Sequence, residues 1–226
     1  MISTGLKVAV SWSAGKDSSL SLYRSLSSGC QICCLLNMIN RDARRSMSHG
    51  LDPKLIAAQA EAMEIPIVQR ETTWETYEEE FKAAVAELKQ RGIGGVVFGN
   101  IDSQGDKEWV ERVCGELDVV PILPLWGNEP QQLLNDFIDA GFEAIVVSAK
   151  AQFFGEEWLG RRVDRGFIEE LLTLNNVHLC GEQGEYHTFV LDSPIFKRRI
   201  KIIESSKVLR EGYRFLDISG YELEDK

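Results

Sequence analysis

The sequence predicts an α/β fold: a five-stranded parallel sheet with helices on both faces, followed by a smaller α+β region. Three observations support this prediction. Strand-like and helix-like segments alternate through the first half of the chain. The strand-like segments are apolar throughout, as in strands that are buried on both sides. The alternation ends near residue 127 and gives way to shorter, more polar β-like stretches. We therefore expect two domains, residues 1–127 and residues 128–226.

The strands of the predicted sheet are short apolar runs, and each of the first four is followed by apolar residues at helical spacing. Helices that connect parallel strands must cross over the sheet, so they cover its faces. In such sheets the ligand lies beyond the C-terminal ends of the strands. The expected strands are residues 6–12, 32–39, 65–68, 95–99 and 119–123, and the expected helices are residues 17–26, 53–63, 77–88 and 106–117.

The third of these helices has the clearest signals. Apolar residues repeat at helical spacing from Tyr77 to Leu88. Thr72 and Glu75 have the spacing of a capping box, and the glutamates at 78–80 suit the positive end of a helix. A glycine at position 92 predicts where the helix stops.

The second region continues with fewer regular elements. A segment with apolar residues at helical spacing precedes Gly141, and a valine-rich strand follows it. The expected elements are helices at residues 128–140 and 167–174, a strand at 142–148, and β-like stretches at 188–191, 199–204 and 213–218.

Composition restricts the class of protein. The 226 residues include 25 basic and 35 acidic side chains, a formal net charge of −10. This charge disfavours binding to nucleic acid, and two small basic clusters, residues 41–45 and 197–201, are interpreted as solvated charge rather than as a site for one anion. The longest apolar run, residues 32–39, is far shorter than the roughly 20 residues that a bilayer requires, so no membrane partner is expected.

The location of the protein is expected to be cytoplasmic. No secretion leader precedes the first strand. The five cysteines are an odd number, which predicts free thiols.

The most informative segment is the turn after the first strand. Residues 8–18 read Val-Ala-Val-Ser-Trp-Ser-Ala-Gly-Lys-Asp-Ser, so a buried strand ends in small residues and a helix begins near Asp17. The amides of such a turn and the positive end of the helix favour an anion. Ser13 and Ser18 add hydroxyl donors, and Lys16 adds a positive charge. The turn predicts a site for a phosphate chain; an ordinary serine-capped turn is the alternative.

Two other phosphate motifs are excluded. A Walker A loop would need glycine at Val10 and serine or threonine at Asp17. A dinucleotide fingerprint beginning at Gly92 would need a third glycine at Val97, and this stretch precedes a strand rather than a helix.

A second polar constellation lies near the end of the chain, where residues 180–190 read Cys-Gly-Glu-Gln-Gly-Glu-Tyr-His-Thr-Phe-Val. Two carboxylates beside a histidine could bind an amine, hold a metal ion or move a proton. The alternative is a polar hairpin tip with one hydrogen-bonded histidine.

These two segments carry a resemblance to a known family. Residues 13–18 resemble the SGGKDS pyrophosphate loop of the N-type ATP pyrophosphatases, with Ala14 where glycine is usual; a side chain there is tolerated if its φ is negative. Together with residues 181–188, which resemble the signature GEGGEYHT, they make the chain similar to the diphthine–ammonia ligase family, also called the ATP-binding DUF71 family. Further matching stretches are residues 124–127, 159–161 and 194–197.

The resemblance implies an adenine nucleotide alpha-hydrolase-like fold of the HUP type and an amide-forming reaction. Members of the family use ATP and ammonia to convert the carboxylate of diphthine, a modified histidine on translation elongation factor 2, into the amide of diphthamide. ATP and Mg²⁺ are the implied cofactors. The oligomeric state stays open, with a homodimer as one option.

The resemblance also implies roles for individual residues. Lys16, Asp17, Glu185 and His187 are the candidate catalytic residues, and Asp17 is the candidate Mg²⁺ ligand through the phosphates. His49, after the second strand, is expected to face the same cleft or to be a loop histidine. The candidate ATP-binding residues are Ser11, Ser13, Ala14, Gly15, Lys16, Asp17, Ser18, Met38 and Gly99, and the candidate substrate-binding residues are His49, Glu182, Gly184, Glu185, Tyr186, His187 and Thr188.

Two other functions remain open on the sequence alone. One is a sulfur-transfer or tRNA-modifying enzyme on the same ATP-binding fold, which Cys30, Cys33 and Cys34 suggest; the acidic charge and the lack of a second cysteine pair oppose it. The other is a non-enzymatic ATP sensor, for which Ala14 in the phosphate turn is the argument.

Overall fold

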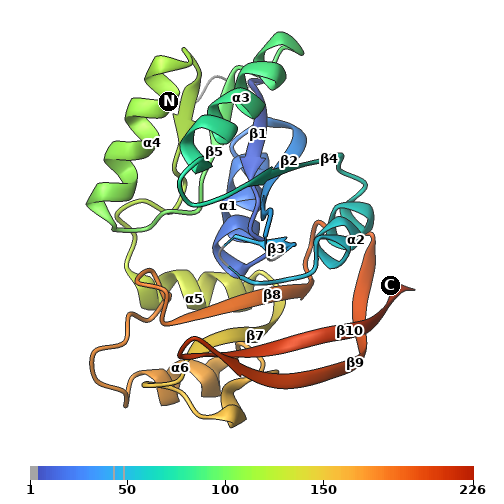
Figure 1. Ribbon diagram of the computed structural model, residues 1–226, viewed down its shortest axis with the longest axis vertical. Helices are drawn as coiled ribbons and strands as arrows, with labels where there is room; N and C mark the ends of the chain where they lie inside the picture. Colours follow the sequence, from blue (N-terminus) through green and yellow to red (C-terminus); the bar gives the residue numbers. More distant parts are fainter. Residues whose placement is uncertain (1–4, 43, 48) are drawn as a thin grey trace.

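The computed structural model describes residues 5–42, 44–47 and 49–226 and confirms the α/β class (Figure 1). Its first sheet contains five parallel strands in the order β4-β2-β1-β5-β6, and a short sixth strand runs antiparallel to the end of β2. The expectation that no secretion leader precedes the first strand concerns residues 1–4, which lie outside the described residues. The strands are β1 (Lys7–Ser11), β2 (Gln31–Asn40), β3 (Arg45–Ser46), β4 (Ile67–Thr72), β5 (Gly95–Val97) and β6 (Val120–Ile122).

Helices cover both faces of this sheet. Side chains alternate between the faces of a strand, so Ala9 of β1 packs in one apolar cluster with Phe81 and Val113, while Val8 and Val10 pack in another. The first cluster includes side chains of α3 and α4, which therefore cover one face, and the second includes side chains of α1 and α2, which cover the other. The helices are α1 (Lys16–Ser27), α2 (Pro53–Met63), α3 (Tyr77–Gln90) and α4 (Gln104–Glu116).

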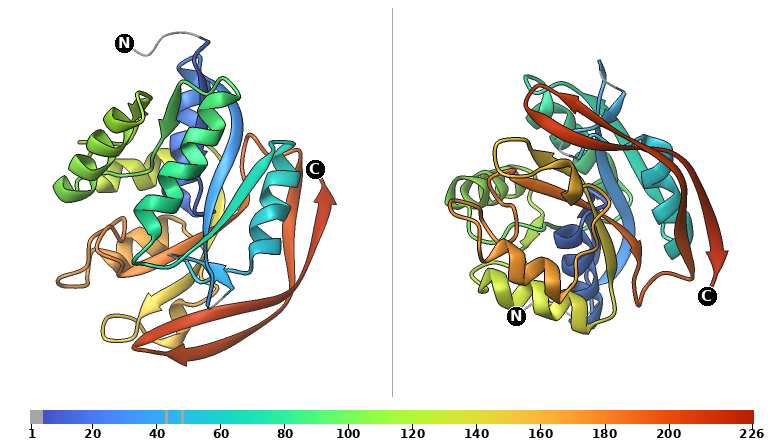
Figure 2. Two further views of the ribbon diagram at one scale, coloured as in Figure 1. Left: turned by 45° about the horizontal axis from the view of Figure 1, so that its top comes forward. Right: turned by 90° about the horizontal axis from the view of Figure 1, so that it is seen from below.

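The remainder of the chain forms a second, antiparallel sheet in the order β8-β7-β10-β9. It is more regular than the expected β-like stretches, because β9 and β10 pair over 13 residues each. Only the start of β10 pairs with β7. The rest of the β9–β10 hairpin extends beyond β7 and β8 and contacts α2 (Figure 2). The elements are α5 (Pro130–Asp139), β7 (Glu143–Lys150), the 3₁₀ turn η1 (Glu156–Trp158), α6 (Arg165–Leu171), β8 (Tyr186–Asp192), β9 (Arg198–Arg210) and β10 (Tyr213–Asp225).

One predicted helix signal is wrong. The capping box of Thr72 and Glu75 does not form, because β4 extends to Thr72 and α3 begins only after Thr76. The Thr76 hydroxyl instead accepts a hydrogen bond from the amide of Thr73 at 3.1 Å, which closes a turn between the strand and the helix.

Other properties of the chain agree with expectation. All five cysteines are free. Among the helices in the described part of the chain, none combines the length and the hydropathy needed to span a membrane.

A buried glutamine joins the two sheets. The Gln59 side chain in α2 accepts a hydrogen bond from the Trp12 indole at 3.1 Å. Its amide group donates to the carbonyls of Ala14 and Val190, at 3.0 and 2.7 Å. Gln59 is completely buried, so these bonds satisfy the Trp12 indole N–H and the two carbonyls where water cannot reach them. They also fix the turn after β1 against β8.

Replacing Gln59 by leucine should lower the free energy of unfolding by about 2–4 kcal/mol, because the Trp12 indole N–H and the Val190 carbonyl lose their buried partner. Urea unfolding followed by tryptophan fluorescence measures the change. Gln90→Leu, at an exposed position in the last turn of α3, is the matched control. Equal stability of the two variants would contradict this account of Gln59.

Candidate active site

A cleft of about 640 Å³ lies where the C-terminal ends of β1 and β5 meet the loop that precedes β8. Most of the residues expected from the sequence line it. Met38 instead lines a small adjoining hollow of about 80 Å³, which it shares with Ser11, Ser13 and His49. Ala14, Gly15 and Glu185 are close in sequence to the cleft residues but do not line it. The predicted residues in the lining are Ser11, Ser13, Lys16, Asp17, Ser18, His49, Gly99, Glu182, Gly184, Tyr186, His187 and Thr188.

The backbone of the phosphate turn is unusual at one residue. Ala14 has a φ of +71°, in the left-handed region that disfavours a side chain, so the condition under which a side chain is easily tolerated there, a negative φ, is not met. The Ala14 carbonyl accepts hydrogen bonds from Gln59 and from the backbone amide of Val190, at 3.0 and 3.1 Å. These two bonds hold the turn in a conformation that alanine alone would not favour.

The first turn of α1 is completed by the second sheet. Gly15 occupies the N-cap position and has no side chain to cap the helix. The Thr188 hydroxyl of β8 accepts the hydrogen bond of the Lys16 amide at 3.0 Å and takes over this task. The hydroxyls of Ser13 and Ser18 lie 3.1 Å apart and close the turn on its other side.

Two glycines allow the close approach of neighbouring backbone. A Cβ on Gly15 would lie 2.7 Å from the His49 Nε2 atom and 3.2 Å from the Thr188 carbonyl oxygen. A Cβ on Gly99 would lie 3.1 Å from the backbone at Asp17 and Ser18. The start of α1 is therefore enclosed by β8 and by the segment after β5.

Lys16 is buried, with 4% of its surface exposed, and its ammonium donates hydrogen bonds to two protein groups. It donates to the Asp17 carboxylate at 2.8 Å and to the Cys180 carbonyl at 2.5 Å, and it lies 5.0 Å from the centre of the Tyr186 ring. Burial alone would lower the pKa of Lys16, but the attraction and hydrogen bond of Asp17, together with smaller contributions from Tyr186 and Cys180, raise the pKa. The side chain is thus a fixed positive charge at the floor of the cleft.

Two histidines meet in the cleft: His49 from the turn after β3 and His187 from β8. The ring centres of His49 and His187 are 4.6 Å apart with their planes tilted by 49°. Burial lowers the pKa of His187 to about 4, and Lys16 contributes in the same direction. Burial also lowers the pKa of His49, and its neighbours His187 and Lys16 add to the shift. Both rings are therefore neutral at pH 7 and available to accept a proton.

The two glutamates of the second motif are placed differently. Glu185 is buried, and its carboxylate accepts from the amides of His178 and Gln183 at 2.9 Å each, so it organises the loop before β8. Glu182 lines the cleft and accepts from the Ile101 amide at 3.0 Å. Burial raises the pKa of the Glu182 carboxyl, and the nearby Asp17 carboxylate adds to this effect.

Several residues that build the site were not expected from the sequence. Gln59, buried behind the phosphate turn, lies on the otherwise apolar side of α2, and this mismatch in the pattern is the signal that could have identified it. The aromatic rings at the mouth of the cleft come from the loop before α3 and from β10, where alternate residues of the strand face the same side. The unexpected residues that line the cleft include Trp74, Phe98, Ser148, Glu211, Tyr213 and Phe215.

Comparison with known proteins gives consistent similarities along the chain. Residues 6–121 match the family model of the diphthamide synthase N-terminal domain, and residues 129–223 match that of the diphthamide synthase C-terminal domain. The chain is 31% identical to the diphthine–ammonia ligase of Rattus norvegicus and 30% identical to that of Homo sapiens, in each case over 98% of this chain and 94% of the relative. A crystal structure of a predicted subunit of tRNA methyltransferase from Methanocaldococcus jannaschii is similar with a TM-score of 0.48 at 16% identity, covering 83% of this chain and 98% of that chain.

Gly15→Ala should destabilise the protein by about 1–3 kcal/mol, because the added Cβ displaces the His49 ring and the backbone of β8. Gly105→Ala in α4 is the matched control; nothing lies within 4 Å of its added Cβ, so this helical position should gain about 0.5–1 kcal/mol. Thermal unfolding of both variants gives the comparison, and a neutral Gly15→Ala would show that the contact with His49 does not constrain the turn.

Stability should fall as the pH is lowered from about 6.5 to 4. The unfolded chain binds a proton at His187 near pH 6.5, whereas the folded protein binds it only near pH 4. The contribution of neutral His187 to the free energy of unfolding is complete above pH 6.5 and is lost between pH 6.5 and 4. In His187→Gln the free energy of unfolding should therefore fall by about 1–3 kcal/mol less across this pH range than in the wild type, as measured by urea unfolding at several pH values. An unchanged pH dependence in this variant would refute the assignment to His187.

Proposed function

Because the chain belongs to the diphthamide synthase family, we propose that it is an ATP-dependent ligase that adenylates the carboxylate of diphthine and couples it to ammonia. The products are diphthamide, AMP and pyrophosphate. One observation carries the proposal: a single cleft brings the turn at residues 13–18 together with the loop at residues 181–188, and Lys16 bridges the two. The relatives named diphthine–ammonia ligase support it over nearly the whole chain.

The first half-reaction uses the turn after β1. The acceptor carboxylate attacks the α-phosphorus of ATP, and negative charge grows on the departing pyrophosphate. The positive end of α1 and the Lys16 ammonium stabilise this charge. The Ser13 and Ser18 hydroxyls do so once they turn from each other and from the Gly15 carbonyl toward the phosphates. Because Lys16 is buried, its electrostatic effect is stronger than it would be in water.

Mg²⁺ fits this site only with the help of the phosphates. Within the described residues, no group of three or more histidine, cysteine, aspartate or glutamate side chains could hold a metal ion. Asp17 lines the cleft, and it would share a Mg²⁺ ion with the phosphate oxygens, as is usual for this cation. The ion would neutralise charge on the triphosphate.

The adenine is proposed to lie toward the hollow beside β2. Ser11 and Met38 line this hollow, as does Tyr77, which stacks on Trp74 with ring centres 6.4 Å apart. Aromatic faces and the apolar Met38 suit a flat base. This placement leaves the phosphates directed at the start of α1.

The second half-reaction uses the histidine pair. Ammonia attacks the activated carbonyl, and the attacking nitrogen must lose a proton as the amide bond forms. His187 and His49 are neutral and face each other in the cleft, so either ring can take this proton. Glu182 is proposed to hold the incoming ammonia, and Glu185 to position the loop that carries Glu182 and leads into β8, the strand of His187.

The further properties of the protein are also proposals. The acceptor is diphthine on translation elongation factor 2, the protein acts in the cytoplasm, and the chain divides at residues 127 and 128. The two matched ranges and the two sheets support this division. The oligomeric state stays open, with a homodimer as one option.

Sulfur transfer is a weaker alternative. Burial raises the pKa of the Cys34 and Cys114 thiols to about 11 and that of Cys180 to about 12. Such thiols stay protonated at pH 7, whereas sulfur chemistry needs the thiolate. Burial therefore disfavours Cys34, Cys114 and Cys180 as sulfur carriers.

Lys16→Met keeps most of the side chain but removes its charge. It should lower the rate of ATP-dependent pyrophosphate release about 10²–10³-fold, the usual effect of losing one donor to a developing anion. The measurement uses diphthine-bearing elongation factor 2, ammonium and ATP, with mass spectrometry to detect conversion of the acid to the amide. Lys89→Met, on the surface at the end of α3, is the matched control. Full activity of Lys16→Met would show that the phosphates bind elsewhere.

A further inference from the structure

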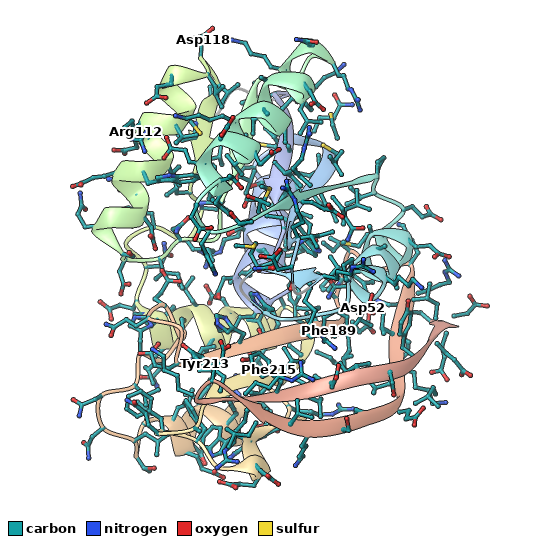
Figure 3. The ribbon with its side chains drawn as sticks, viewed as in Figure 1. Asp52, Arg112, Asp118, Phe189, Tyr213 and Phe215 are labelled. Carbon is teal, nitrogen blue, oxygen red and sulfur yellow. The ribbon has the colours of Figure 1, made fainter. Side chains whose placement is uncertain are left out.

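Two aromatic rings stand side by side at the mouth of the cleft. Tyr213 and Phe215 occupy alternate positions at the start of β10, and alternate residues of a strand face the same side. Their ring centres are 6.2 Å apart with the planes tilted by 34°. Both residues are labelled in Figure 3. Both line the cleft and neither belongs to the turn or the loop that holds the proposed chemistry.

A carboxylate lines the cleft together with these rings. Glu211, in the turn between β9 and β10, lines the same cleft. It makes no ion pair with any residue of the described chain. By contrast, Asp217, on the same side of β10, pairs with Arg45 at 2.7 Å. The Glu211 backbone has a φ of +49°, so the turn holds a non-glycine residue in the left-handed region.

The rings adjoin the residues of the amide-forming step. The Phe215 ring packs on Gly50, next to His49 in the chain, where a Cβ would lie 2.9 Å from a ring carbon. The Tyr213 hydroxyl lies 3.6 Å from the position that a Cβ on Gly184 would take, on the loop that leads into β8, the strand of His187. A group bound against the rings is thus a near neighbour of both histidines.

Two aromatic faces and a free carboxylate form a site for one kind of group. A cation without N–H groups cannot use hydrogen bonds, but it is attracted by the negative faces of aromatic rings and by a carboxylate. A neutral apolar group would leave Glu211 unused, and an anion would be repelled by it. The nearby Lys150 ammonium is held by the Gln183 carbonyl at 2.7 Å and does not fill the site.

We propose that Tyr213, Phe215 and Glu211 bind a quaternary ammonium group of the acceptor, next to the carboxylate that is converted into the amide. This inference rests on the proposed function for the identity of the acceptor, because diphthine carries a trimethylammonium group on the carbon that bears its carboxylate. Binding of this cation fixes the carboxylate beside the histidines. It also makes the enzyme select a fully methylated acceptor.

A kinetic experiment tests this selection with diphthine-bearing elongation factor 2 and with the same protein carrying a primary ammonium in place of the trimethylammonium. Tyr213→Leu, Phe215→Leu and Glu211→Gln should each raise KM for the methylated acceptor about 3–30-fold, while KM for ATP stays within about twofold. Tyr213→Phe keeps the ring and should restore the value. Tyr221→Leu, on β10 but outside the cleft, is the matched control.

A binding experiment separates this inference from the proposed function. Saturation-transfer NMR with the protein alone compares (trimethylammonio)acetate with 3,3-dimethylbutanoate, which replaces the nitrogen by carbon. The first compound should bind at the mouth of the cleft and the second more weakly, and the ring variants should abolish the difference. Equal signals from both compounds would overturn the inference, whatever the activity. A raised KM for ATP in the ring variants would also overturn it and would assign the rings to the adenine. Absence of amide formation by the wild-type protein, with selective binding intact, would overturn only the proposed function.

Discussion

The start of α1 is the constraint on which the site depends. The first amides of a helix have no partner within the helix, and here they lie at the floor of the cleft beside a glycine that offers no cap. The Thr188 hydroxyl, 172 positions further along the chain, accepts a hydrogen bond from the Lys16 amide. The Lys16 ammonium in turn donates to the Cys180 carbonyl. The phosphate turn is therefore a structure that the second sheet completes, so the two halves of the chain build one site.

An acidic protein has to attract an anionic substrate, and the distribution of its buried charge shows how. The formal net charge is −10, yet the floor of the cleft holds the positive end of α1, the Lys16 ammonium and two neutral histidines. Neutral rings next to Lys16 add no repulsion to a buried cation, and they stay free to take a proton. The charges that face the nucleotide are few, but burial strengthens each of them.

The sequence predicted the parallel sheet because a buried parallel strand is apolar along its whole length, as residues 32–39 are. It predicted the turn around Lys16 because strand, turn and helix start are contiguous. It missed the role of Gln59, whose partners lie 45 and 131 positions away, and it could not say which φ Ala14 adopts, which is +71° in the turn. Local patterns carry no information about partners that only the tertiary fold brings together.

The curved hairpin of β9 and β10 ties the last part of the chain to the first. The Tyr221 hydroxyl donates to the Lys54 carbonyl at 3.1 Å, and Arg198 pairs with Glu61 at 2.7 Å. One apolar core also runs without a break from α1 and α2 into the second sheet. The two halves thus share their stabilising contacts, and neither can loosen without exposing the interior of the other. These shared contacts favour the loss of cleft, core and hairpin together when the protein unfolds.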